Sequence, residues 1–140
     1  MNSIKDHPFF GGISPAHVDL IVKGVSANLV EYESDALLLT EGEPANQFFL
    51  IESGLVAIET GAAVIQIIGP GEALGWSWLF PPFNWHFRAR ALHRTKAYIL
   101  DAGSLLVLCE ENHSLGYELI RQVTQIAITH MEAAIKKLVL

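Results

Sequence analysis

Short segments rich in β-branched and aromatic residues follow one another closely between residues 28 and 68, with only turn residues between them. Five strands are predicted in this region, and a last hairpin follows after a loop: residues 29–32, 36–40, 47–53, 55–59 and 63–68, then 89–92 and 96–100. These short connections leave no room for the helical crossovers that parallel strands need, so the strands must form antiparallel hairpins. The chain is therefore expected to fold as a sandwich, a barrel or a jelly roll. Residues 48–51 are apolar throughout, which predicts a central strand.

Helical patterns flank this β-rich region. Ser14 offers an N-cap and Pro15 suits the first helical position, so a short helix is predicted over residues 16–24. A length of 140 residues with 51% hydrophobic composition is enough for one domain with a buried core. We expect a single domain over residues 1–140, with an N-terminal helical segment (1–25), a β-domain (26–102) and C-terminal helices (103–140).

Two more helices are predicted after the last hairpin. Asp101 or Ser104 can cap a short helix over residues 105–111, and Ser114 can cap a long helix that follows it. The fold class expected from the whole pattern is mainly β with flanking helices.

The long helix carries an apolar stripe at a spacing of three and four residues. Its members are Leu119, Val123, Ile126, Ala127, His130, Ala134 and Leu138. A seam sustained for this length needs a partner, which predicts a homodimer through this helix. Ile120, Ile128, Met131 and Ile135 are apolar as well, so one helix face can pack on the chain's own β-domain and another on a second subunit. A helix buried only within its own chain is the alternative.

Charge and cysteine content exclude several functions. The net charge is −6 and no run of Lys or Arg occurs, which argues against a nucleic-acid surface. Cys109 is the single cysteine, so an internal disulfide and a cysteine-ligated iron–sulfur cluster are excluded and a reducing compartment is expected. No apolar run approaches the ~20 residues that span a bilayer, and the first seven residues do not resemble a signal peptide. A cytoplasmic protein without a membrane segment is expected.

The segment from residue 69 to residue 91, GPGEALGWSWLFPPFNWHFRARA, concentrates the unusual residues of the chain. It contains all three tryptophans, three glycines and the Pro81-Pro82 pair. Glycine allows close backbone approach, proline prevents a regular ladder, and indoles offer broad apolar faces. The segment is either a binding loop or a rigid β-corner whose aromatic rings fill the core.

The order of these elements, together with particular motifs, resembles the cyclic-nucleotide-binding domains of Crp/Fnr-type regulators over nearly the whole chain. The segment EGEPANQFFLIESGLVAIETG, residues 41–61, is similar to that family's second to fifth strands. IIGPGEALG, residues 67–75, looks like the entry into its phosphate-binding cassette, and Ala91 matches the small residue that closes the cassette. The resemblance implies an antiparallel double-stranded β-roll, jelly-roll-like, with an N-terminal helix and a long C-terminal helix. It also implies a non-enzymatic regulatory function, transmitted through that last helix.

The residues that hold a cyclic nucleotide in this family are missing. In members that bind cyclic AMP or cyclic GMP, a glutamate after the second cassette glycine bonds the ribose and an arginine six residues before the closing alanine pairs with the phosphate. Here these places hold Trp76 and Trp85, so we expect no ordinary cyclic-nucleotide binding, while another small ligand stays open and no cofactor is implied. Arg88 or His86 is a candidate replacement cation. The candidate pocket comprises Leu74, Gly75, Trp76, Ser77, Trp78, Trp85, His86, Phe87 and Arg88.

Three other functions lack the motifs or segments that they require. A cupin-like metal-dependent enzyme would use a similar roll, but the six histidines include no His-x-His pair followed by a carboxylate, so no metal site is predicted. Haem ligation by Cys109 or a histidine has no supporting motif. Family transcription factors continue into a helix-turn-helix domain for which this chain has no room after Leu140, so direct DNA binding is not expected.

Overall fold

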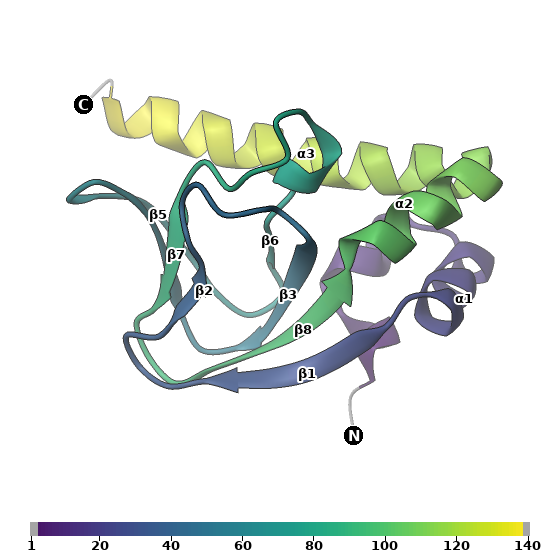
Figure 1. The fold of residues 1–140 in the computed structure, drawn as a ribbon, viewed down its shortest axis with the longest axis horizontal. Coiled ribbons are helices and arrows are strands. Elements are labelled where there is room, and N and C mark those ends of the chain that lie inside the picture. The colour runs from purple at the N-terminus through teal and green to yellow at the C-terminus, as the bar shows by residue number, and fades with distance from the viewer. Residues whose placement is uncertain (1–2, 139–140) are drawn as a thin grey trace.

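The computed structural model describes residues 3–138 and contains two antiparallel sheets and three α-helices (Figure 1). The helices are η1 (Ile4–Asp6), η2 (Pro8–Gly12), α1 (Pro15–Gly24), η3 (Ser77–Leu79), α2 (Ala102–Glu111) and α3 (His113–Leu138), where η denotes a 3₁₀ helix. The strands are β1 (Ala27–Tyr32), β2 (Leu37–Leu39), β3 (Gln47–Ser53), β4 (Val56–Thr60), β5 (Ala63–Ile68), β6 (Ala73–Leu74), β7 (Arg88–Ala91) and β8 (Thr95–Asp101).

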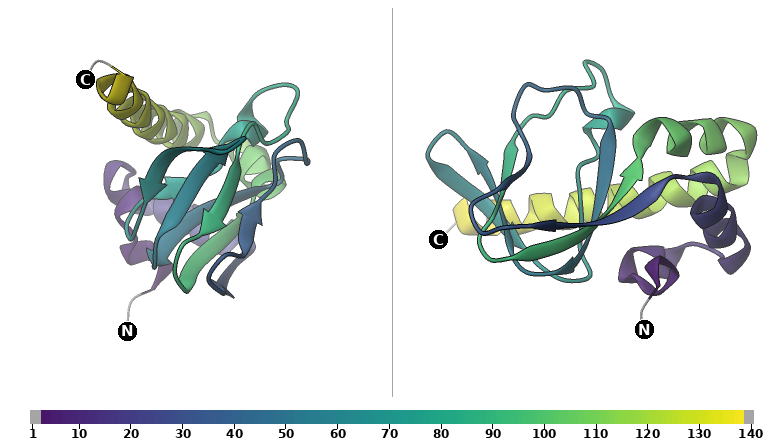
Figure 2. Two further views of the ribbon diagram at one scale, coloured as in Figure 1. Left: turned by 90° about the vertical axis from the view of Figure 1, so that its left-hand side faces the viewer. Right: turned by 60° about the horizontal axis from the view of Figure 1, so that its bottom comes forward.

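The eight strands form a double-stranded β-roll. One sheet has the order β1-β8-β3-β6 and the other β2-β7-β4-β5, and every pair is antiparallel. Helices α1 and α2 gather at one end of the roll, and α3 runs along its flank toward the other end (Figures 1 and 2). There the Nζ atom of Lys137 donates a hydrogen bond to the carbonyl of Ile65, at 3.2 Å. The mainly β fold with flanking helices is confirmed.

The predicted strands agree with the structure within a few residues. Strands β3 and β5 have the predicted bounds, whereas β2 is shorter because its register with β7 shifts between Leu37 and Leu39. Strand β6 was not predicted, since two residues are too few to show a period. It forms because Leu74 pairs with Phe49 of the central strand.

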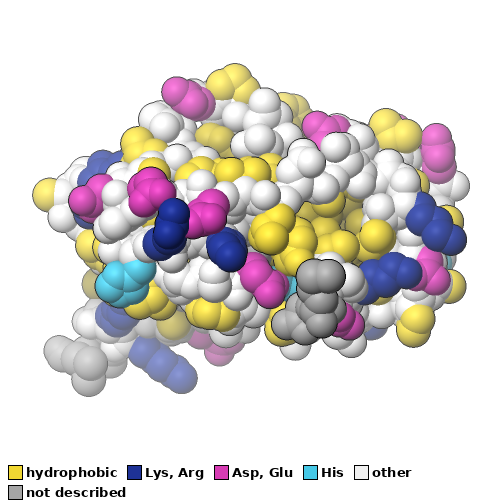
Figure 3. All heavy atoms as spheres, turned by 90° about the horizontal axis from the view of Figure 1, so that it is seen from below, with side chains coloured by type: hydrophobic (Ala, Val, Ile, Leu, Met, Phe, Trp, Pro, Cys, Tyr) yellow, Lys and Arg dark blue, Asp and Glu magenta, His cyan; other side chains and the backbone are white. Residues whose placement is uncertain are grey.

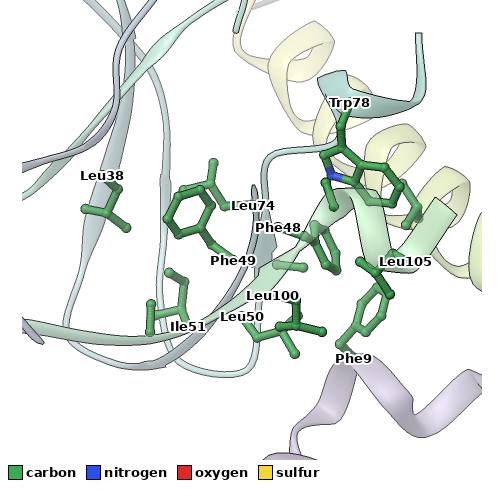
Figure 4. Packing of buried hydrophobic residues seen from close by; sticks show 14 of the residues in the cluster. Phe9, Leu38, Phe48, Phe49, Leu50, Ile51, Leu74, Trp78, Leu100 and Leu105 are labelled. Atoms are coloured by element: carbon green, nitrogen blue, oxygen red, sulfur yellow. The ribbon is translucent and has the colours of Figure 1, made fainter. Parts of the chain in front are cut away.

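The core lies on both sides of β3, whose residues 48–51 are fully buried. Successive side chains of a strand point to opposite faces, so Phe49 points into the roll while Phe48 points toward the helices (Figure 4). The ring of Phe48 makes edge contacts with Phe9 and Trp78, with centroids 5.0 Å and 5.7 Å away. The predicted central strand is therefore confirmed, and it joins the roll to the N-terminal segment.

The helix boundaries differ from the prediction in their caps. Asp101 caps α2 as expected, because its carboxylate accepts the backbone N–H of Ser104 at 2.9 Å. Ser114 does not cap α3, which begins one residue earlier; Asn112 does so by accepting the N–H of Leu115 at 3.0 Å. An Asn side chain serves this position as well as Ser does, so composition alone could not choose between them.

Ser14 precedes α1 as predicted, but its hydroxyl does not cap that helix. It donates instead to the carboxylate of Glu118 on α3, at 2.9 Å, and the same carboxylate pairs with His17. These hydrogen bonds, that of His17 first, hold the pKa of Glu118 below its usual range. The polar group therefore ties α1 to α3.

Helix α3 turns the predicted seam inward. Leu119 and Val123 are only 1% and 3% exposed because they pack into the chain's own core, so they cannot be offered to a second subunit. Ile126 packs against the same core. The apolar and aromatic residues that α3 leaves exposed are Tyr117, Ile120, Ile128, Met131, Ile135 and Leu138. The seam assignment is therefore wrong for Leu119 and Val123, whereas Leu138 of the same stripe is exposed, and a partner contact on α3 stays a prediction.

No basic patch lies on the face of the molecule that Figure 3 shows. In Figure 3, Lys and Arg side chains lie among Asp and Glu side chains. Arg94 pairs with both Glu31 and Glu33. Within residues 3–138, no helix is both long enough and apolar enough to cross a bilayer.

Candidate functional site

A cavity of about 460 Å³ lies between the β-roll and α3. It is lined by Leu39, Ile58, Ile65, Gln66, Leu74, Gly75, Trp76, Ser77, Phe80, Trp85, His86, Phe87, Ala127, His130, Met131 and Ala134. Both strand sheets and α3 contribute walls, and the volume is within the range of small-molecule sites. Seven of the nine candidate pocket residues line it; Trp78 and Arg88 do not.

Trp85 forms a fixed wall of the cavity. Its backbone is held by two hydrogen bonds, from its own N–H to the carbonyl of Glu43 at 2.9 Å and from the N–H of Gly42 to its carbonyl at 2.8 Å. The indole is only 6% exposed and packs against Phe49 and Gly75. The place that the resemblance assigns to a phosphate-binding arginine is thus occupied by a buried indole.

Trp76 is half-buried and lies beside α3. Its ring centroid is 5.5 Å from that of His130, and the planes are inclined by 45°. Nε2 of His130 is 3.8 Å from a carboxylate oxygen of Glu72, whose other oxygen accepts the N–H of Gly69 at 2.6 Å. Burial lowers the pKa of His130, an effect that Glu72 partly opposes. The lowered pKa favours the neutral form of the imidazole.

His86 and Ser77 supply polar atoms at the cavity. The Ser77 hydroxyl and Nδ1 of His86 are 3.4 Å apart, at the limit of a hydrogen bond. Both side chains belong to the loop between β6 and β7, which brings them together although nine residues separate them.

Trp78 belongs to the core and not to the cavity. It is 1% exposed, and its Nε1–H donates to the carbonyl of Gly75 at 2.6 Å. Of the three tryptophans that the sequence places in one loop, two face the cavity and the third anchors the loop to the roll. The aromatic plug is confirmed for Trp78, while Trp76 and Trp85 line the cavity and a binding role for the loop stays a prediction.

Arg88 is held away from the cavity by an ion pair. Its Nε donates to the carboxylate of Glu59 at 2.8 Å, and Arg90 pairs with the other carboxylate oxygen. Ala89 and Ala91 are fully buried, so the two arginines share the opposite face of β7, as predicted for Arg90. The two guanidinium groups, that of Arg90 first, hold the pKa of Glu59 below its usual range.

The described part of the chain offers no metal-binding set. Among residues 3–138, no three His, Cys, Asp or Glu side chains gather where they could hold an ion. Cys109 is half-buried, and burial raises the pKa of its thiol, which disfavours the reactive thiolate.

Several lining residues were not predicted. Ala127, His130 and Ala134 were assigned to the dimer seam, and Ile65, Phe80 and Met131 to no site. The register of the β4–β5 hairpin pairs Ile58 with Gln66, so a correct hairpin alignment could have placed these two together. The contribution of α3 has no local sequence signal.

An antiparallel roll with a glycine-rich loop and a C-terminal helix that together line a cavity is the architecture of a double-stranded β-roll domain. The family model of the cyclic nucleotide-binding domain matches residues 29–112, and the chain belongs to this family. No curated protein sequence matches the chain.

Solved structures of the same fold are distant in sequence. A Geobacter metallireducens protein assigned to the cyclic nucleotide-binding proteins is similar with a TM-score of 0.82 and 19% identity, over 94% of this chain and 99% of that one. A cyclic nucleotide-binding domain from Methylobacillus flagellatus has a TM-score of 0.80 and 21% identity, over 93% and 75%. The catabolite activator protein of Thermus thermophilus has a TM-score of 0.69 and 21% identity, over 94% of this chain and 62% of that one.

Proposed function

We propose that this chain is a non-enzymatic regulatory domain that senses a small ligand in the cavity but does not hold a cyclic nucleotide in the manner usual for the family. The observation that carries the proposal is the position of two indoles. Trp76 and Trp85 line the cavity at the places where the resemblance expects the ribose-binding glutamate and the phosphate-binding arginine.

The absence of this arginine should greatly weaken the binding of a cyclic phosphate. A buried phosphate anion needs a cation or several N–H donors, and loss of a two-pronged charged partner costs about 2–5 kcal/mol, or roughly 30- to several-thousand-fold in affinity. Arg88 is the nearest guanidinium along the chain, but moving it would break its pair with Glu59, which is only 2% exposed. Breaking a buried ion pair is costly, so Arg88 is a poor replacement.

The regulatory part of the proposal rests on α3. This helix lines the cavity with Ala127, His130 and Ala134, so a bound ligand would touch the roll and the helix together. Its exposed apolar face is available to a second copy of the chain or to a protein partner. We place a homodimer contact on this face. The single cysteine fits a reducing compartment, so we assign the domain to the cytoplasm.

Calorimetry tests the proposal. The unmodified protein should show no saturable heat with millimolar cyclic AMP or cyclic GMP. Trp76→Glu combined with Trp85→Arg is the smallest change that supplies both missing anchors, and Trp76→Gln combined with Trp85→Gln is its uncharged control. Micromolar binding of cyclic AMP by the unmodified protein would contradict the proposal, and loss of that binding in Arg88→Ala would identify the cation. Metal analysis of the purified protein tests the enzymatic alternative.

A further inference from the structure

The lining of the cavity has an unusual chemical composition. Four aromatic side chains face it, Trp76, Phe80, Trp85 and Phe87, and most of the remaining walls are aliphatic. Among the described residues that line it, none is Lys, Arg, Asp or Glu. The polar side chains are Gln66, Ser77, His86 and His130.

We infer that the ligand of this cavity is an uncharged, flat aromatic molecule of two or three fused or linked rings that carries one or two hydrogen-bonding atoms. The inference rests on the proposed function, because it names the chemical class of the ligand for the same cavity.

The charge of the ligand follows from the lining. An ion moved from water into an apolar cavity without a partner loses its hydration and gains nothing in return. The carboxylate of Glu72 lies beside His130, does not line the cavity, and accepts the backbone N–H of Gly69. The nearest guanidinium along the chain, that of Arg88, is bound to Glu59 on the other face of β7. Neither of these groups lines the cavity, and the Lys137 ammonium that bonds the carbonyl of Ile65 does not line it either.

The shape of the ligand follows from the rings. Aromatic rings pack well in offset or edge-to-face arrangements, and a flat ligand can meet several of them at once. Trp85 and Phe87 reach the cavity from the segment that leads into β7, and Trp76 reaches it beside α3. A volume of about 460 Å³ holds a ligand of two or three rings, whereas a single ring would leave much of it empty.

The polar residues of the lining indicate that the ligand carries a hydrogen-bonding atom. The amide of Gln66 and the neutral imidazole of His130 each offer a donor and an acceptor without a charge. A phenolic hydroxyl, a ring N–H or a carbonyl can form hydrogen bonds with such groups, and a purely hydrocarbon ligand would form none.

Three probes of matched size separate the alternatives at pH 7: 2-naphthol is flat and neutral, 2-naphthoate is flat and anionic, and 1-decanol is neutral but aliphatic. By calorimetry and thermal shift, 2-naphthol should bind and stabilise the protein, and each of the other two should bind at least about tenfold more weakly. Tighter binding of 2-naphthoate would overturn the neutral class, and tighter binding of 1-decanol would overturn the aromatic class. No binding of 2-naphthol would overturn the inference altogether.

Two variants locate the binding. Ala134→Phe fills the cavity from α3 and should weaken 2-naphthol at least about tenfold, whereas Ala133→Phe, at a neighbouring half-buried position that does not line the cavity, should leave it unchanged. Phe87→Leu removes one ring at a position that is 44% exposed, so it should weaken 2-naphthol without unfolding the protein. Equal binding by all variants would place the probe elsewhere and refute the assignment. Failure of 2-naphthol with no binding of cyclic AMP would refute only this inference, whereas micromolar binding of cyclic AMP would refute the proposed function.

Discussion

The indole of Trp85 lies directly against the backbone of Gly75. A Cβ atom added at residue 75 would stand 3.0 Å from Cη2 of Trp85 and 3.3 Å from a ring carbon of Phe49. The φ angle of Gly75 is +89°, a conformation that side chains with a Cβ rarely adopt. This contact lets the indole close the cavity wall, and it explains why glycine is needed at this place.

Gly75→Ala should therefore destabilise the protein through both the backbone and the contact. Gly42→Ala is the matched control, because Gly42 has the same φ of +89° but nothing within 4 Å of its added Cβ. The control should lose about 1–2 kcal/mol of unfolding free energy from the left-handed backbone, and Gly75→Ala should lose at least about 1 kcal/mol more through overpacking. Urea unfolding measures both. Equal losses of unfolding free energy in the two variants would show that Trp85 moves aside at no energetic cost.

The exposed face of α3 should carry the dimer contact. Ile128→Glu combined with Ile135→Glu should convert a dimer to a monomer in sedimentation velocity, because both side chains are about half exposed in the single chain, at 46% and 50%, and neither lines the cavity. Leu20→Glu on α1, also exposed, is the control and should leave the assembly unchanged. Val123→Glu should instead unfold the protein, since it buries an unpaired charge. A monomer at tens of micromolar for the unmodified chain would remove the proposed transmitter role.

Acidification should weaken the fold through His7. This side chain is 4% exposed; its Nε2–H donates to the carbonyl of Ile51 at 2.8 Å, and its Nδ1 accepts the N–H of Phe9 at 3.1 Å. Burial lowers the pKa of His7 below 6.5, while the bond to Ile51 partly opposes the shift.

The unfolded chain therefore binds the proton at a higher pH than the folded one does. The contribution of neutral His7 to the free energy of unfolding is fully present above about pH 6.5. It falls as the pH drops toward the folded pKa, by up to about 1.4 kcal/mol per pH unit for one proton. His7→Gln should flatten this dependence in urea unfolding at several pH values, and adding His130→Gln should flatten it further because burial lowers that pKa too. An unchanged slope in His7→Gln would show that the imidazole is not the group responsible.

Glu59 should be a second source of acid sensitivity, with its own pH range. Because Arg90 and Arg88 lower the pKa of Glu59, its contribution to stability is present above the unfolded value of 4.5 and is lost as the pH falls through the folded value. Glu59→Gln should lower the melting temperature at pH 7, and the difference from the unmodified protein should shrink on acidification.

The control for Glu59 is Asp19→Asn. The pKa of Asp19 is also lowered, by its pair with Lys5, but its side chain is 49% exposed against 3% for Glu59. Exposed pairs contribute little, so Asp19→Asn should shift the melting temperature much less. Equal shifts would show that the two arginines do not depend on the buried carboxylate.

The strands could be predicted because their signal is local. The run from Phe48 to Ile51 is apolar without interruption, and the structure shows why: one set of side chains fills the roll and the other meets the helices. Strand β6 escaped prediction because its two residues pair with β3 only after the loop has folded back. Motifs in the sequence also predict that Trp76 and Trp85 stand where related proteins have the ribose-binding glutamate and the phosphate-binding arginine.

The order of elements and the family follow from residue type and spacing along the chain, and the same pattern predicts the loss of the usual polar anchors. The face of α3 that turns inward depends on tertiary packing: periodicity shows that Leu119 and Val123 share a face with His130, but not what that face meets. Tertiary packing also places Trp78 in the core, apart from the two other tryptophans, and brings Arg88 next to Glu59. Glu59 and Arg88 are 29 residues apart and meet because β4 and β7 are in register, so contacts between distant segments depend on the packing of whole elements, which no local pattern encodes.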